Sequence, residues 1–226
     1  MKKINKFVFL FTLLIFAFSA VVSAQNKNDE KRNVKQPPRL MVFDASQSYS
    51  LQNSTQIFKE VLNPSPQTSF TTLKQEQDPL GFIHQKMQQY FKGLKVEFAT
   101  VTLSSKNGMV QTLNSAYSPI ADDFNVTPSI NGPQALNSAL AHVGATKYMW
   151  QNTSEAALAD YQKPTGELVI FPAMKNISET NRLAYKFDIY ATAPLYRADV
   201  YIDANTGQFI FENKRIHHAN VPATGT

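Results

Sequence analysis

The 226-residue sequence contains no cysteine. It therefore has neither a disulfide framework nor a thiolate metal site, and its fold must be held together by a hydrophobic core. Three catalytic signatures are also missing: the His-Glu-x-x-His helix of zinc proteases, the Gly-x-Ser-x-Gly elbow and the glycine-rich phosphate loop. No histidine among His84, His142, His217 and His218 has a Glu-x-x-His partner. We therefore expect no catalytic residue, bound metal or cofactor within these residues.

The sequence has little excess charge once its N-terminus is set aside. Three of the 22 basic residues, Lys2, Lys3 and Lys6, lie in the first 24 positions, so the remainder carries 19 basic and 17 acidic residues. The formal charge of +5 then falls to +2. No run or face of lysine and arginine stands out, and we expect no nucleic-acid partner.

The first 24 residues are typical of a secretory signal peptide. Three lysines precede an apolar run from Phe7 to Val22, and small residues lead to an expected cut between Ala24 and Gln25. The run is shorter than the roughly 20 apolar residues of a membrane-spanning helix. We therefore expect a secreted or periplasmic protein without a stable membrane anchor after signal removal.

The rest of the chain predicts an α+β fold, with two small domains in series that each pack a helix on an antiparallel sheet. Residues 25–39 are polar and predict a flexible leader, and residues 118–128 predict a linker with two prolines. The expected segments are a signal peptide (1–24), a leader (25–39), a first domain (40–117), a linker (118–128), a second domain (129–212) and an extended tail (213–226).

Apolar spacing predicts the elements of the first domain. Asn107-Gly108 is a strong signal for a type I′ hairpin turn, and Lys92-Gly93 permits another reversal. The expected elements are a strand at Leu40–Phe43, a helix at Leu51–Leu62, and strands at Gly81–Phe91, Leu94–Ser104 and Met109–Asn114.

The second domain repeats the order of helix and strands. Asn131 is a suitable cap for a helix with Pro133 in its first turn, and Gly144 suits the helix end. A short helix is expected within Thr153–Tyr161, followed by strands at Leu168–Phe171, Leu183–Tyr190, Ala198–Asp203 and Phe209–Phe211.

Two segments resemble known propeptide domains. Within GFIHQKMQQYFKGLKVEFATV, the positions that resemble the fungalysin and thermolysin propeptide signature are His84, Gln88, Tyr90, Gly93 and Val96. The segments LAYKF and YIDANTG resemble the PepSY domain through Tyr185, Asp203 and Gly207. In this order, the two motifs resemble the pro-region of a thermolysin-like zinc metalloprotease.

The resemblance implies a folding and blocking role. Such a pro-region acts in cis as an intramolecular chaperone and an inhibitor of its catalytic domain, which would lie outside these residues and would hold zinc and calcium. The expected partner is therefore the cognate metalloprotease catalytic domain. An alternative is a free-standing secreted PepSY-type inhibitor or an envelope binding protein that acts in trans.

We interpret most of the motif residues as structural. His84 and His142 fit a packed strand histidine and a histidine at a helix C-terminus. Asp203 begins a sequence that superficially resembles a calcium loop, but an Asx-type turn is the better interpretation because the later acidic ligands are missing. Four tyrosines near the last strands would pack in the core or form a docking surface: Tyr185, Tyr190, Tyr196 and Tyr201.

The tail from Asn213 to Thr226 has no apolar period, and we expect it to be an exposed extended strip. By the same resemblance, the cut between pro-region and mature enzyme should fall here. The favoured bond is His218–Ala219, and the alternative is Asn220–Val221. His217 or His218 would then be either solvated or close to the catalytic zinc.

Overall fold

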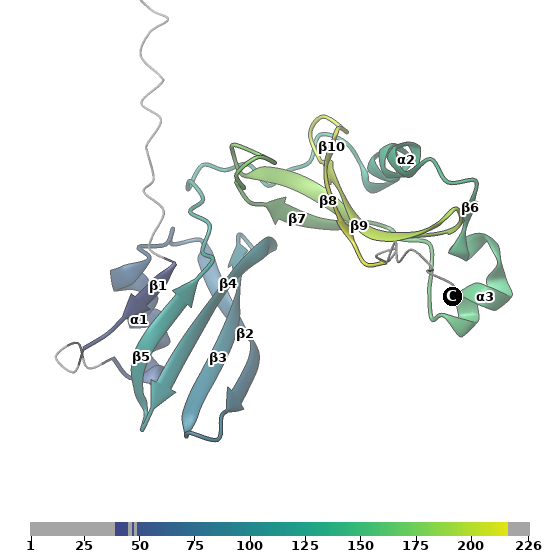
Figure 1. Cartoon of the computed structure of the whole chain (residues 1–226). Coiled ribbons are helices and arrows are strands. Elements are labelled where there is room, and N and C mark those ends of the chain that lie inside the picture. The colour runs from purple at the N-terminus through teal and green to yellow at the C-terminus, as the bar shows by residue number, and fades with distance from the viewer. Residues whose placement is uncertain (1–38, 45–46, 48, 217–226) are drawn as a thin grey trace, which may run out of the picture. The chain divides into compact units, whose positions relative to one another are not determined.

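A computed structural model describes residues 39–44, 47 and 49–216 of the chain (Figure 1). The expected signal peptide with its Ala24–Gln25 cut, most of the leader, and the His218–Ala219 and Asn220–Val221 bonds lie outside the described residues.

The described residues before position 118 form one short 3-10 helix, one α-helix and an antiparallel meander. Asn107 and Gly108, with φ of 53° and 78°, form the tight turn that the sequence predicted. Each strand from β2 to β5 pairs antiparallel with the next, and β1 joins β5. The elements are β1 (Leu40–Val42), η1 (Leu51–Asn53), α1 (Ser54–Val61), β2 (Thr68–Gln77), β3 (Phe82–Phe91), β4 (Leu94–Lys106) and β5 (Met109–Ser115).

Helix α1 covers one face of this meander. Ile57 and Phe58 are buried against side chains such as Val101 and Leu103 from β4 and Leu113 from β5. Burial of this apolar face stabilises the helix, which has only eight residues and would be marginal alone.

The second part of the chain has the capped helix that the sequence predicted. The Asn131 side chain accepts from the backbone N–H of Gln134 and the Gln134 side chain accepts from the N–H of Asn131, while Gly144 ends the helix at φ 63°. The elements are α2 (Gly132–Val143), β6 (Lys147–Tyr148), η2 (Met149–Gln151), α3 (Thr153–Leu158), β7 (Glu167–Phe171), β8 (Arg182–Ala193), β9 (Leu195–Asp203) and β10 (Phe209–Lys214).

Helix α2 lies over one face of the strands β8, β9 and β10 (Figure 1). Leu136 and Ala139 pack on Phe187 and Ile189 of β8 and on Val200 of β9. The two parts therefore each place a helix on an antiparallel sheet, as expected for an α+β fold.

The strands belong to one ten-stranded sheet, whose main path is β1-β5-β4-β7-β8-β9-β10. A single parallel pair, Val96 with Ile170, joins the two groups of strands. A small apolar cluster that includes Phe91 and Ile120 surrounds this pair. The expected domain boundaries themselves remain a prediction.

The expectation of an extended tail from Asn213 is wrong for its first residues. Asn213 and Lys214 belong to β10 and pair with Asp199 and Ala198. The backbone N–H of Arg215 then donates to the carbonyl of Arg197 at 2.8 Å. A polar sequence without an apolar period can still form an edge strand, because the neighbouring backbone supplies its hydrogen bonds.

Candidate functional site

A β-bulge lies where β4 leaves the first group of strands. Phe98 has a φ of 59°, which is rare for a residue other than glycine, and the β3–β4 register shifts between Gln88 and Tyr90. The Gln88 side chain is buried, and its Nε2 lies 2.6 Å from the carbonyl of Val96 and 2.9 Å from that of Ala99. The Gln88 side chain thus donates hydrogen bonds to carbonyls of β4 that the bulge withdraws from the backbone pairing with β3.

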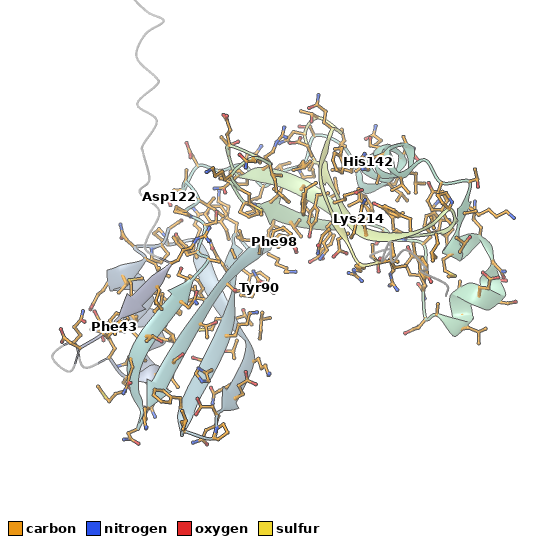
Figure 2. The ribbon with its side chains drawn as sticks, viewed as in Figure 1. Phe43, Tyr90, Phe98, Asp122, His142 and Lys214 are labelled. Atoms are coloured by element: carbon orange, nitrogen blue, oxygen red, sulfur yellow. The ribbon has the colours of Figure 1, made fainter. Side chains whose placement is uncertain are left out.

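The other motif positions of this segment surround the same bulge. Gly93 has a φ of 81° and forms the β3–β4 turn, and Tyr90 pairs with Lys95 across that turn. Val96 is fully buried and pairs with β7. Figure 2 labels Tyr90 and Phe98 at this end of β4. These positions bend β4 so that its first residues reach the second group of strands.

His84 lies at the other end of β3, in a hydrogen-bonded chain. Its Nδ1 is 2.9 Å from Ser104 Oγ and its Nε2 is 3.2 Å from Asp78 Oδ2. Asp78 Oδ1 also accepts from the backbone N–H groups of Phe82 and Leu80, and these bonds, with that of His84, hold the pKa of Asp78 below its usual value. This arrangement fixes the β2–β3 turn.

The motif positions of the second segment also shape turns and packing. Asp203 Oδ1 accepts from the backbone N–H groups of Asn205 and Thr206 at 2.9 and 2.8 Å, which is an Asx-type turn. Gly207 closes this turn with φ 73°. The Tyr185 hydroxyl donates to the carbonyl of Ile130, just before α2.

The four tyrosines divide between the two faces of the sheet. Tyr185 and Tyr196 pack on the α2 side, where the Tyr196 hydroxyl donates to Glu212 at 2.7 Å. Tyr190 and Tyr201 lie on the opposite face, which we call the second face. The four tyrosines therefore do not share one surface, and a docking role for any of them stays a prediction.

Aromatic side chains cover one part of the second face. Phe98 lies 5.9 Å from both Phe171 and Tyr201 between ring centroids, and 6.2 Å from Phe211. Phe98 remains 39% exposed, whereas Tyr201 and Phe171 are fully buried. We call these four residues the aromatic patch. The bulge in β4 places Phe98 over the other three rings, on the solvent side of the patch.

Seven charged side chains of alternating sign cross the rest of the second face, and we call them the charge ladder. In order they are Lys95, Glu97, Lys186, Asp199, Arg215, Asp188 and Arg197. Lys186 Nζ lies 3.9 Å from Asp199 Oδ2, and Arg215 Nη2 lies 2.7 Å from Asp199 Oδ1. Each inner residue of the ladder therefore has an oppositely charged neighbour on both sides. These ion pairs offset the energetic cost of burying the carboxylates.

Glu97 is the most buried carboxylate of the ladder. Burial raises the pKa of Glu97, but its contacts with Lys95, Lys186 and Tyr201 lower that pKa by more. The net pKa lies below the usual value, so Glu97 is charged at neutral pH. Burial and the neighbouring Glu97 raise the pKa of Tyr201 well above its usual value, so its hydroxyl is a donor.

Arg197 ends the ladder between two aromatic rings. Its guanidinium lies 4.9 Å from the Tyr190 ring centroid and 5.6 Å from that of Tyr161, while it bonds both oxygens of Asp188. Burial raises the pKa of Tyr161 to about 12. Asp188 and Arg197 are thus held together by an ion pair at this end of the ladder, and Arg197 also contacts two aromatic rings.

Sequence reasoning missed both the ladder and the role of Gln88. Lys186, Asp188 and Asp199 appear in the sequence only as the polar positions of alternating strands. Their shared face follows from the alternation, but their pairing with Glu97 does not. Among residues 39–44, 47 and 49–216, no three His, Asp or Glu side chains are placed to hold a metal ion. None of the described helices is long and apolar enough to span a membrane.

Comparisons with known proteins give one family match. Residues 68–117 match the Fungalysin/Thermolysin Propeptide Motif, which indicates a protease propeptide. No curated protein is significantly similar to the chain. Among solved structures, the Bacillus megaterium YpeB C-terminal domain aligns with a TM-score of 0.35 and 14% identity, covering 81% of this chain and 69% of that chain. A TM-score this low does not establish a shared fold.

Proposed function

We propose that this chain is the pro-region of a secreted thermolysin-like zinc metalloprotease, and that it acts as an intramolecular chaperone and inhibitor of the catalytic domain. The observation that carries this proposal is the match of residues 68–117 to the propeptide motif. In support, the matched segment includes the bulge that directs β4 toward β7. The PepSY-like second part, Tyr185 to Gly207, supplies the surface that would meet the enzyme.

The second face suits that role. A protein interface commonly combines aromatic and arginine anchors near its centre with a polar rim. Here the aromatic patch presents Phe98, and the charge ladder presents ion-paired side chains that lose little freedom on docking. A rigid template of this kind lowers a folding barrier by binding the partly folded catalytic domain more tightly than its unfolded chain.

The zinc would belong to the partner. These 226 residues contain no His-Glu-x-x-His sequence, so the zinc, and any calcium, would be held by the catalytic domain. The chain itself would contribute contacts and a blocked cleft, and export would place both parts outside the cytoplasm.

The test is refolding of a thermolysin-like catalytic domain from the same organism, with and without this chain. We expect a higher yield of active enzyme when the chain is present, and slower peptide hydrolysis when it is added to folded enzyme. Equal refolding and unchanged hydrolysis would contradict the proposal. Inhibition in trans without any gain in refolding would favour a free-standing inhibitor.

A pair of charge reversals tests the docking face. Glu167 is exposed beside the ladder, and Glu179 is exposed in the β7–β8 connection. Glu167→Lys should weaken inhibition about tenfold, because reversing a charge inside an interface disturbs its electrostatic complementarity, whereas Glu179→Lys should leave inhibition unchanged. Equal effects of the two variants would place the docking surface elsewhere.

A further inference from the structure

The end of β10 carries an adjacent pair of basic residues. The sequence has three such pairs, Lys2-Lys3, Lys31-Arg32 and Lys214-Arg215, and the last one alone falls within the described residues. A cut after this pair would separate the described fold from everything that follows it, and no helix or strand would be divided. Figure 2 labels Lys214 on β10.

Arg215 is clasped by carboxylates from two strands. Its Nη1 lies 3.1 Å from Asp188 Oδ2 on β8, and its Nη2 lies 2.7 Å from Asp199 Oδ1 on β9. Its backbone N–H donates to the carbonyl of Arg197 at 2.8 Å. The Asp199 side chain is only 8% exposed, so the clasp is anchored in the sheet. We call these contacts the Arg215 clasp.

At Lys214 and Arg215 the backbone is paired with β9, although the two side chains are exposed to solvent. The side chains of Lys214 and Arg215 are 55% and 43% exposed. Endopeptidases bind several residues of substrate in an extended form, with the backbone free to pair with the enzyme. Here the backbone of Asn213 and Lys214 already pairs with β9. Cleavage therefore requires the end of β10 to detach, which breaks the clasp.

We propose that Lys214-Arg215-Ile216 is a latent processing site for an endopeptidase that cuts after basic residues, and that the Arg215 clasp holds it closed. Cleavage would be hydrolysis: one water molecule adds across the Arg215–Ile216 amide bond, leaving a carboxylate on Arg215 and an amine on Ile216. The enzyme would need an acidic specificity pocket for the guanidinium or ammonium group. Use of this site in maturation rests on the proposed function, whereas the site and its clasp do not.

The test is limited digestion of the full chain with trypsin, with mass spectrometry of the fragments that begin at Arg215 or Ile216. Asp199→Asn keeps both basic residues but removes one arm of the clasp. When opening is fast relative to cutting, the rate follows the population of the open form. We expect Asp199→Asn to be cut at this site about tenfold faster than the unaltered chain.

Two further variants keep the test decisive. Arg215→Gln leaves Lys214 as the only target and removes both arms, so the cut after Lys214 should also accelerate about tenfold. Arg182→Gln is the matched control, because it removes an Arg–Asp pair with Asp203 elsewhere in the sheet. The control should change the rate less than about twofold, because detaching the end of β10 is a local opening that leaves the Arg182–Asp203 pair in place.

Several outcomes would overturn the proposal. The site would not be latent if trypsin cut the unaltered chain there as fast as the clasp variants. If Arg182→Gln accelerated the cut as much as Asp199→Asn, general destabilisation would explain both effects. Trp150 fluorescence shows whether Asp199→Asn folds. If it does not, Arg215→Lys replaces it, because lysine keeps the positive charge but cannot contact Asp188 and Asp199 with two separate nitrogens. Its cutting rate should lie between those of the unaltered chain and Arg215→Gln. None of these readouts needs a catalytic domain, so they fail independently of the proposed function.

Discussion

The Tyr201 hydroxyl donates a 2.9 Å hydrogen bond to the carboxylate of Glu97, which lies 104 positions earlier in the chain. Tyr201 is fully buried and Glu97 is 4% exposed, so water cannot replace this bond. The bond connects the start of β4, just before the bulge, to β9 on the second face. It joins the aromatic patch to the charge ladder.

Glu97→Gln should therefore destabilise the protein strongly. The change leaves Lys95 and Lys186 without their shared buried carboxylate, and breaking a buried ion pair in this way costs about 3 kcal/mol. The free energy of unfolding can be measured with urea and the fluorescence of Trp150, the single tryptophan. The exposed Glu179→Gln should change it by less than about 0.5 kcal/mol. Equal effects would mean that the Glu97 ion pairs are not needed for stability.

Tyr201→Phe isolates the hydrogen bond from the charge. The substitution keeps the ring that contacts Phe98 and Phe171 and removes only the hydroxyl. A hydrogen bond to a charged group contributes about 1.5–3 kcal/mol, and we expect a loss in that range. In the double variant with Glu97→Gln, the two losses should not add, because Glu97→Gln keeps an acceptor for the hydroxyl but already removes the charge that strengthens the hydrogen bond. Additive losses would contradict the contact.

The free energy of unfolding should fall in acid, because Glu97 and Glu212 become protonated. The pKa of Glu97 and that of Glu212 are lowered in the fold; burial raises each, but the ion pairs and hydrogen bonds lower each by more. Groups of this kind contribute stability that is present above the unfolded pKa of about 4.3 and is lost as pH falls through the lower folded pKa. Urea midpoints between pH 7 and pH 3 should decline mainly below pH 5. The decline should be smaller in Glu97→Gln, and an equal decline would assign it to other carboxylates.

Much of the fold could be predicted because its signals are local. The Asn131 cap, the Asn107-Gly108 turn and the alternating apolar residues of β8 each depend on residues close in sequence. The bulge could not be predicted, because Phe98 adopts a positive φ without being glycine or asparagine. The charge ladder could not be predicted either, since its order depends on which strands become neighbours.

The tail illustrates the same limit. Asn213 and Lys214 have no apolar pattern, yet they extend β10 because the edge of β9 offers unpaired backbone groups. Arg215 then forms ion pairs with Asp188 and Asp199, which belong to two other strands. A polar segment next to a strand is therefore a weak signal for an extended linker when the sheet edge beside it is open.

Gln88→Leu should test the bulge. The Gln88 amide is within hydrogen-bond distance of three carbonyls, those of Gln89, Val96 and Ala99. Leucine would leave buried acceptors without donors, at a cost of about 2–3 kcal/mol. Gln85→Leu is the control on the same strand, because Gln85 is partly exposed and its amide donates to the Thr72 hydroxyl, not to a backbone carbonyl. A similar loss in both variants would contradict a special role for Gln88.

Two glycines with positive φ separate backbone strain from crowding. Gly166 has φ 92°, and a Cβ added there would lie 2.7 Å from Cε1 of Phe187; Gly108 has φ 78° and nothing within 4 Å of an added Cβ. Both alanine variants would carry a strain of about 1 kcal/mol in the left-handed region. Phe187 is fixed in the core against α2, so it cannot move aside without a further cost of about 1–3 kcal/mol.

Gly166→Ala should therefore lower the free energy of unfolding by at least about 1 kcal/mol more than Gly108→Ala. The comparison is direct, because the two changes add the same methyl group at similar φ. The measurement is urea unfolding followed by far-ultraviolet circular dichroism, which reports on both groups of strands. Equal losses would mean that the connection before β7 shifts to accept the methyl group, and that Phe187 does not restrict the backbone there. A larger loss at Gly166 would mean that the core of the second part fixes the strand that β4 joins.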